Sequence, residues 1–182
     1  MDAPPPGDLV GDLTRWLAEQ RADAAAAARA RERWLRQAAD EDALLSGVLL
    51  DLAERGATVV VQGTTGRTHR GHVRGVGEDF LALRTAQADV LLRHDAVVAI
   101  RADGVPVGGS DRAHALDLGL GEAVAALAGE RPRVLLVTRD GTGLAGELRS
   151  AGRDVLTLRL DDGAGTVYVP LAALAEVTVT ER

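Results

Sequence analysis

The amino-acid sequence contains two copies of one module. Residues 45–88 align with residues 120–163 at a constant offset of 75, and a two-residue insertion at 164–165 then changes the offset to 77. Glycines and alternating apolar residues recur together, so backbone geometry and a buried face are repeated as well as composition. A period this long predicts two small domains. The matched pairs include Leu52/Leu127, Val59/Val134, Gly66/Gly141, Gly71/Gly146, Arg74/Arg149, Asp79/Asp154, Leu83/Leu158 and Val90/Val167.

Each copy is expected to form a helix followed by five short strands. Apolar residues at helical spacing run to Gly56 in the first copy and to Gly129 in the second. Gly71 and Gly146 lie inside the long second strand, where glycine permits the sharp bend that closes a small barrel. Alternation and turn glycines predict strands over 58–63, 67–76, 79–85, 89–93 and 97–101, and over 133–138, 142–151, 154–160, 166–170 and 174–180.

The predicted fold class is therefore α+β or mainly β. An N-terminal helical segment precedes two bent, five-stranded barrels, and a helix precedes each barrel. The expected divisions are an amphipathic helix over 1–39, a first repeat over 40–102, a Gly/Pro linker over 103–116 and a second repeat over 117–182. The two predicted cores consist of the pairs Val59/Val134, Val61/Leu136, Val73/Leu148, Leu81/Leu156, Leu83/Leu158, Val90/Val167, Leu92/Val169 and Ile100/Val177.

Both tryptophans of the chain belong to the predicted N-terminal helix. Trp16 and Trp34 are 18 residues apart, which is five helical turns, so they share one stripe. This stripe is expected either to dock onto the chain's own barrels or to contact another copy or a protein partner.

Charge separates the first repeat from the rest of the chain. The net charge of −6 argues against a protein that coats nucleic acid without specificity. Residues 57–101 nevertheless carry 6 Arg against 4 acids. On the second strand, Arg70, His72 and Arg74 share a face by alternation, and Arg67 points the other way. Such a face suits phosphate contacts, although a solvated strand face is the alternative.

Several classes of function find no support in the sequence. Without cysteine the chain has neither disulfides nor thiolate chemistry. His69 and His72 lie on opposite strand faces and cannot share a metal ion, and no nucleophile, phosphate loop or cofactor motif appears. We therefore expect a protein with no enzymatic activity, no metal and no cofactor. The missing lysine and the abundant Ala and Arg indicate a bacterial genome rich in GC. Apolar runs fall short of the roughly 18–20 residues of a membrane helix, so a cytoplasmic protein without membrane contact is expected.

Two segments resemble the signatures of the Sm-like family of small SH3-like barrels. They are Gly66-Arg67-Thr68-His69-Arg70-Gly71-His72-Val73 and Val90-Leu91-Leu92-Arg93-His94-Asp95-Ala96-Val97-Val98-Ala99-Ile100. In RNA-binding members, an Asp, an Asn and an Arg-Gly hold and stack a uridine. Here the Asp position falls on Gly77 and Gly152, the Asn position falls on Leu81 and Leu156, and only Arg93 matches the Arg. Phe80 is the aromatic residue available to a base in the first copy, and Tyr168 is the one in the second.

The resemblance implies two hypotheses of function. The first is association with single-stranded RNA through the first barrel, by Arg67, Arg70, His72, Arg74, Phe80 and Arg93. The second is an assembly or adaptor module, because barrels of this family leave an open edge and form rings. In that case copies join edge to edge through strands four and five, a tandem chain satisfies one edge internally, and the helix with Trp16 and Trp34 recruits a partner or another copy.

Overall fold

A computed structural model describes residues 44–103, 114–161, 163 and 165–180, together with residues 29, 31 and 32. The chain from Leu44 onward forms one compact unit, separate from residues 1–43. The predicted N-terminal helix, including Trp16 and Trp34, lies outside the described residues except at positions 29, 31 and 32, which are helical. Most of the predicted linker also lies outside them.

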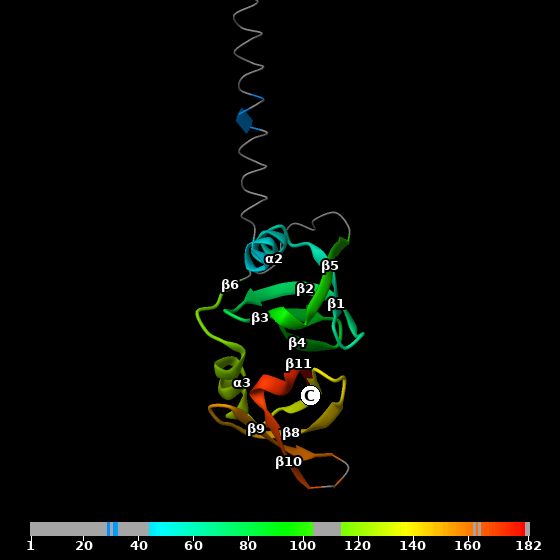
Figure 1. The fold of residues 1–182 in the computed structure, drawn as a ribbon, viewed down its shortest axis with the longest axis vertical. Coiled ribbons are helices and arrows are strands. Elements are labelled where there is room, and N and C mark those ends of the chain that lie inside the picture. Colours follow the sequence, from blue (N-terminus) through cyan, green and yellow to red (C-terminus); the bar gives the residue numbers. More distant parts are fainter. Residues whose placement is uncertain are drawn as a thin grey trace, which may run out of the picture. The chain divides into compact units, whose positions relative to one another are not determined.

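The first half is a helix followed by five strands (Figure 1). A short 3-10 helix, η1 (His94–Ala96), connects the fourth strand to the fifth. The bounds of all five strands agree with the predicted ranges to within two residues, so the strand predictions are confirmed here. The elements are α2 (Leu45–Glu54), β1 (Thr58–Gly63), β2 (Thr68–Val76), β3 (Phe80–Thr85), β4 (Ala88–Arg93) and β5 (Val97–Asp103).

The second half repeats this order and adds one short strand before its helix. The added strand is β6 (His114–Ala115), which pairs in parallel with β2. Its long strands also match the predicted ranges to within two residues. The other elements are α3 (Leu120–Ala128), β7 (Arg133–Thr138), β8 (Gly143–Ala151), β9 (Val155–Leu160), β10 (Thr166–Pro170), η2 (Leu171–Ala173) and β11 (Leu174–Thr180).

The prediction of two closed barrels preceded by helices is wrong. The structure is mostly β, and its long strands form one open antiparallel sheet in the order β10-β9-β8-β7-β11-β4-β3-β2-β1-β5, with two α-helices in the described residues. Strand β4 pairs with β11 of the second half and not with β5 of its own half. Its backbone groups are therefore satisfied across the repeat, so that neither set of five strands closes on itself. The ends of the sheet are β10 and β5.

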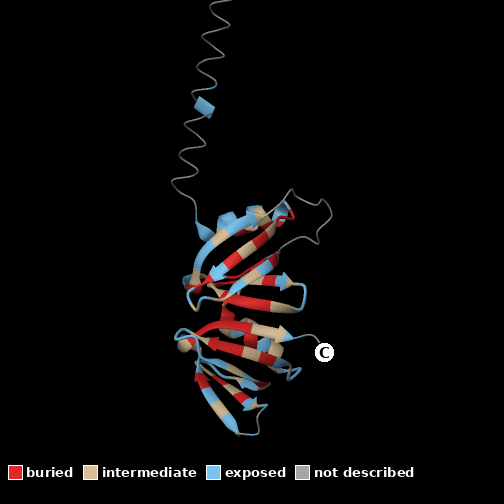
Figure 2. Cartoon of the chain, turned by 90° about the vertical axis from the view of Figure 1, so that its right-hand side faces the viewer, coloured by how far each residue is buried: buried red, intermediate tan, exposed pale blue. Residues whose placement is uncertain are grey.

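Two apolar cores lie in this unit, one for each half (Figure 2). Of the predicted core residues, all are buried except Ile100 and Val167, which are partly buried. Those two lie on β5 and β10, the terminal strands of the sheet, so each lacks a neighbouring strand on one side. The cores also exchange residues, because Phe80 and Leu91 pack in the second core and Ala175 packs in the first.

The repeated glycine of the second strand allows two backbones to approach closely. A Cβ atom at Gly71 would lie 2.1 Å from the carbonyl oxygen of Arg84, and one at Gly146 would lie 2.1 Å from that of Arg159. Both clashes involve backbone atoms of the next strand, which a side-chain rotation cannot relieve. The repeat therefore preserves glycine where the second and third strands of each half press together.

Candidate functional site

The two halves meet where β4 pairs with β11. We call this pairing, with the side chains that contact each other across it, the internal junction. Leu91 lies opposite Val177, and Leu92 lies opposite Glu176. Val177 is fully buried, and Leu91 is 8% exposed. Each half thus contributes one apolar edge strand, and the two strands cover each other and form hydrogen bonds between their backbones.

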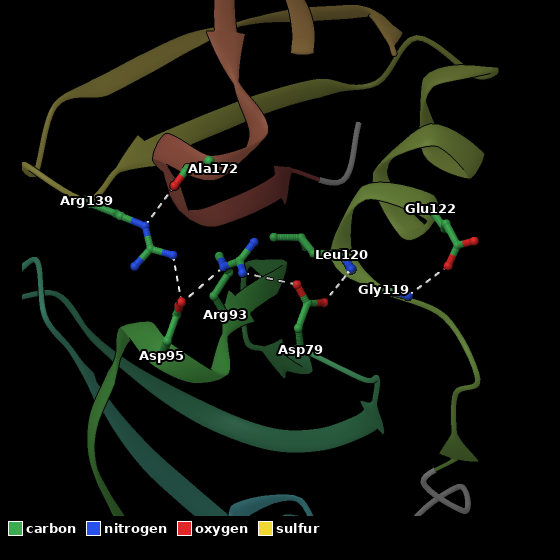
Figure 3. Close-up of polar contacts among 8 residues, drawn as sticks. All are labelled: Asp79, Arg93, Asp95, Gly119, Leu120, Glu122, Arg139 and Ala172. Carbon is green, nitrogen blue, oxygen red and sulfur yellow. Dashed lines mark hydrogen bonds and ion pairs between the residues drawn. The ribbon is translucent and has the colours of Figure 1, made fainter. Parts of the chain in front are cut away.

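A charged cluster crosses the internal junction (Figure 3). The guanidinium of Arg93 lies 3.3 Å from a carboxylate oxygen of Asp79 and 3.3 Å from one of Asp95. On the other side, Arg139 donates from Nη2 to Asp95 at 2.7 Å and from Nε to the carbonyl of Ala172 at 2.9 Å. Burial alone would raise the pKa of Asp95, but the hydrogen bond from Arg139 and the two guanidinium charges outweigh it and lower that pKa.

Asp79 also caps the helix of the second half. Its Oδ1 accepts a hydrogen bond of 2.7 Å from the backbone N–H of Leu120, the first residue of α3. Glu122 reaches back to the N–H of Gly119 at 2.9 Å. Two N–H groups at the start of α3, which have no partner within the helix, are thereby satisfied. At the start of α2, the N-cap residue Leu44 makes no side-chain hydrogen bond, and none of the described residues takes the place that Asp79 has at α3.

A buried carboxylate forms a second polar contact between the halves. Glu176 on β11 is 1% exposed, and it accepts from Arg67 Nε at 3.2 Å and from Thr178 Oγ1 at 2.9 Å. His69 Nε2 lies 2.8 Å from its other oxygen. Burial would raise the pKa of Glu176, but the hydrogen bond and charge of His69, with Thr178 and Arg67, lower it below the ordinary value. The carboxylate is therefore held ionised between the two halves.

The structure separates the predicted RNA-contact residues. Arg67 is bound to Glu176, and Arg93 is bound to Asp79 and Asp95, so both serve the internal junction. Arg67 was predicted from its charge and Arg93 from its match to the Arg of the Sm-like signature, and neither signal indicates an acidic partner elsewhere in the chain.

The remaining predicted residues lie on two neighbouring strands of the first half: Arg70, His72 and Arg74 on β2, and Phe80 on β3. Arg70 forms an ion pair of 3.2 Å with Asp103. Arg74 lines a cavity of about 220 Å³, which is smaller than the roughly 300–1,000 Å³ of ordinary ligand pockets. His72 is partly buried, and its Nδ1 has no hydrogen-bond partner in the described structure. Phe80 is 1% exposed inside the second core, so its ring is not accessible to a base.

The exposed apolar residues gather at the ends of the unit, away from the internal junction. Val98 on β5 is 58% exposed, and Tyr168 on β10 is 69% exposed. Three more lie at the start of α2: Leu44, Leu45 and Val48, at 71%, 39% and 44%. These five are all of the large apolar side chains that are exposed among the described residues. Unpaired strand edges with exposed apolar side chains are typical sites of strand addition.

The sequence reasoning missed Glu176, Asp95 and Arg139. One signal was present for Glu176, because it is a single carboxylate in an apolar strand where the first repeat has Ala99. Asp95 and Arg139 had no such signal, since surface acids and arginines are common in this chain.

Among the described residues, no group of three or more His, Cys, Asp or Glu is arranged to hold a metal ion. No helix in the described part of the chain is long and apolar enough to cross a membrane. No known protein family and no curated protein matches the chain.

Proposed function

We propose that this protein is a non-enzymatic assembly module that joins copies of itself through the two free edges of its sheet. Strand β10 of one copy pairs with β5 of the next. The observation that carries the proposal is the internal junction, in which the equivalent strands of the two halves already make this contact. The resemblance to Sm-like signatures agrees with this role and remains a prediction.

The repeat relates the free edges to the strands of the internal junction. At the offset of 77, β10 corresponds to β4, and β11 corresponds to β5. A copy therefore presents a β4-like edge at one end and a β11-like edge at the other. Transferring the register of the internal junction places Ile100 opposite Tyr168 and Ala99 opposite Val169 of the neighbouring copy. Because the two surfaces differ, the contact is head to tail, and it closes a ring if the rotation per copy permits.

Exposure of the side chains supports this assignment. Tyr168 is 69% exposed, whereas its counterpart Leu91 in the internal junction is 8% exposed. Val98 is 58% exposed, whereas its counterpart Ala175 is fully buried. Pairing with another copy would remove these apolar side chains from water and satisfy the open backbone groups.

Light scattering coupled to size-exclusion chromatography tests the proposal on the full chain. We expect a mass of two or more copies for the wild-type protein. Tyr168→Lys, which places a charge inside the predicted contact, is expected to give monomers. The control Ala145→Lys adds the same charge at an exposed position on β8, a strand paired on both sides, and should leave the assembly intact. A wild-type protein that is monomeric at every concentration reached would refute the proposal.

Association with single-stranded RNA is the second candidate, favoured by one observation. Arg70 and Arg101 flank Val60 on the outer face of the first half, and His72 lies opposite Arg84 on the same face. These basic groups line up across neighbouring strands, as phosphate contacts require. The candidate is weakened because Phe80 and the junction arginines are engaged elsewhere.

A mobility assay with single-stranded RNA at low and high salt tests this second role. Binding through phosphates should weaken steeply with salt, and it should weaken further in a variant that combines Arg70→Ala with Arg101→Ala. The absence of any binding at low salt would remove RNA from consideration.

A further inference from the structure

We infer that helix α2 of one copy docks against the turn between β8 and β9 of a neighbouring copy, where Asp154 accepts a hydrogen bond from the backbone N–H of Leu45. The inference rests on the proposed edge pairing and extends it, because it adds a helix and a specific polar contact to the interface. Its partner is a second copy of this chain.

The internal junction supplies the geometry for this contact. There, α3 begins against the turn between β2 and β3, and Asp79 in that turn accepts the N–H of Leu120 at 2.7 Å (Figure 3). Leu120 is fully buried in the second core, which also contains Phe80 of the first half. The first turn of α3 is thus covered and capped by the half that precedes it.

At the free ends both partners of the equivalent contact are present but separated. Leu45 corresponds to Leu120 and is 39% exposed, and no side chain of the described residues caps the start of α2. Asp154 corresponds to Asp79 and is exposed, and its carboxylate makes no hydrogen bond or ion pair with any described residue. The same repeat that matches the strand edges therefore also matches this acceptor with this helix.

The turn that holds Asp154 already has the required backbone geometry. In the first half, Gly77 N–H bonds to the carbonyl of Phe80 at 2.8 Å, and the carbonyl of Asp79 accepts from His94 at 2.9 Å. In the second half, Gly152 N–H bonds to the carbonyl of Val155 at 2.7 Å. The carbonyl of Asp154 likewise accepts from Leu171 at 2.7 Å. Docking of α2 therefore needs no refolding of the turn, which limits the entropy cost of association.

The distribution of apolar exposure selects a second copy as the occupant. Leu45 and Val48 on α2, Val98 on β5 and Tyr168 on β10 are exposed, and Leu44 precedes α2; no other large apolar side chain of the described chain is exposed. A head-to-tail contact between copies covers exposed apolar side chains from both ends of the unit at once. The internal junction covers the side chains at the equivalent positions of the repeat in the same way. Val48 corresponds to Ala123, which packs against the second core.

The contact between copies differs from the internal junction in charge. The positions of Arg93, Asp95 and Arg139 are taken by Pro170, Ala172 and Thr64. Asp154 therefore has no arginine beside it equivalent to Arg93, and its charge is available to the positive end of the α2 dipole. The side chain consequently acts as a helix cap in this contact and not as a member of an ion-pair cluster.

The test measures the dissociation constant of the full-length assembly by sedimentation equilibrium. Asp154→Ala should weaken association about fivefold per contact, the usual effect of removing an N-cap. Asp154→Asn keeps a side-chain oxygen acceptor and should restore most of the wild-type affinity. Glu130→Ala, which removes an exposed acid after α3, is the matched control and should change nothing. Leu45→Gln should weaken association at least tenfold, because Leu45 is buried in the docked helix.

The outcomes separate this inference from the proposed edge pairing. If Tyr168→Lys gives monomers while Asp154→Ala and Leu45→Gln associate like the wild type, the docking of α2 is wrong and the edge pairing stands. If Asp154→Asn fails to restore affinity, the hydrogen bond to Leu45 is wrong. A monomeric wild-type protein overturns both. Circular dichroism of each variant confirms that a loss of association does not come from unfolding.

Discussion

Replacing Glu176 by glutamine tests the role of the buried carboxylate between the halves. The side chain is 1% exposed and accepts hydrogen bonds from Arg67 and Thr178, with His69 at 2.8 Å. A hydrogen bond to a charged group contributes about 1.5–3 kcal/mol, roughly twice a neutral one. The share of Arg67 is smaller, because its side chain is 41% exposed and water screens the pair. Glutamine keeps the size and one oxygen acceptor. We therefore expect Glu176→Gln to lower the free energy of unfolding by about 2 kcal/mol at pH 7.

The pH dependence of this loss follows from the pKa of Glu176. That pKa lies below the ordinary value of 4.5 in the folded protein, since His69, Thr178 and Arg67 outweigh the effect of burial. A carboxyl group with a lowered folded pKa stabilises the protein above its unfolded pKa, and it loses this contribution as the pH falls through the folded pKa. The difference between wild type and Glu176→Gln should therefore be full near neutrality and shrink below pH 4.5.

Urea unfolding followed by circular dichroism measures both effects. Glu147→Gln is the matched control, because Glu147 pairs with Arg149 at 2.8 Å on the exposed face of β8. That substitution should change the free energy of unfolding by less than about 1 kcal/mol. The reasoning would be refuted if Glu176→Gln were as stable as the wild type at pH 7. It would also fail if the difference between them stayed constant as the pH was lowered.

Three further predictions, two of them with a comparison variant, concern the close packing and the internal junction. Gly146→Ala should destabilise the folded protein by about 1–3 kcal/mol, because the added Cβ would clash with the backbone of β9. In Gly47→Ala, the added Cβ meets no atom within 4 Å, so this change in α2 should stabilise the protein by about 0.5–1 kcal/mol. Thermal unfolding compares the two variants. Leu120→Ala should cost about 2–5 kcal/mol in urea unfolding, and Leu45→Ala in monomeric protein should cost clearly less, since only Leu120 is fully buried. Asp79→Ala should cost about 1 kcal/mol through the lost cap of α3, and an unchanged midpoint of unfolding would contradict that role.

Local features of the fold were predictable because they depend on neighbours in sequence. Alternation of apolar residues fixed the strands and their buried faces, and the matched pairs fixed most of both cores. The closure of each half was predicted wrongly. The sequence of a strand does not specify which neighbour it pairs with. The backbone groups of β4 could form hydrogen bonds with β5 or with the equivalent strand of the other half.

The candidate site was predictable only in part, and for a related reason. The strand edges were expected to matter because barrels of the Sm-like family, which the sequence resembles, leave an open edge. The arginines were assigned to phosphate by their charge, whereas Arg67 binds Glu176, which lies 109 residues away. Electrostatic partners at such separations are decided by the pairing of β4 with β11, which brings Glu176 to the first half.

The sequence by itself determined a duplicated module: its strands, the glycines where strands press together, and two aliphatic interiors. These follow from periodicity and from the volume of a glycine, which are local properties of the chain. The tertiary structure alone decided that neither half closes into a barrel, that the basic residues Arg67 and Arg93 are neutralised at the internal junction, and that the exposed apolar side chains collect at the two ends. These features depend on which strand edges pair with each other, and that pairing is set by the free energy of the whole fold.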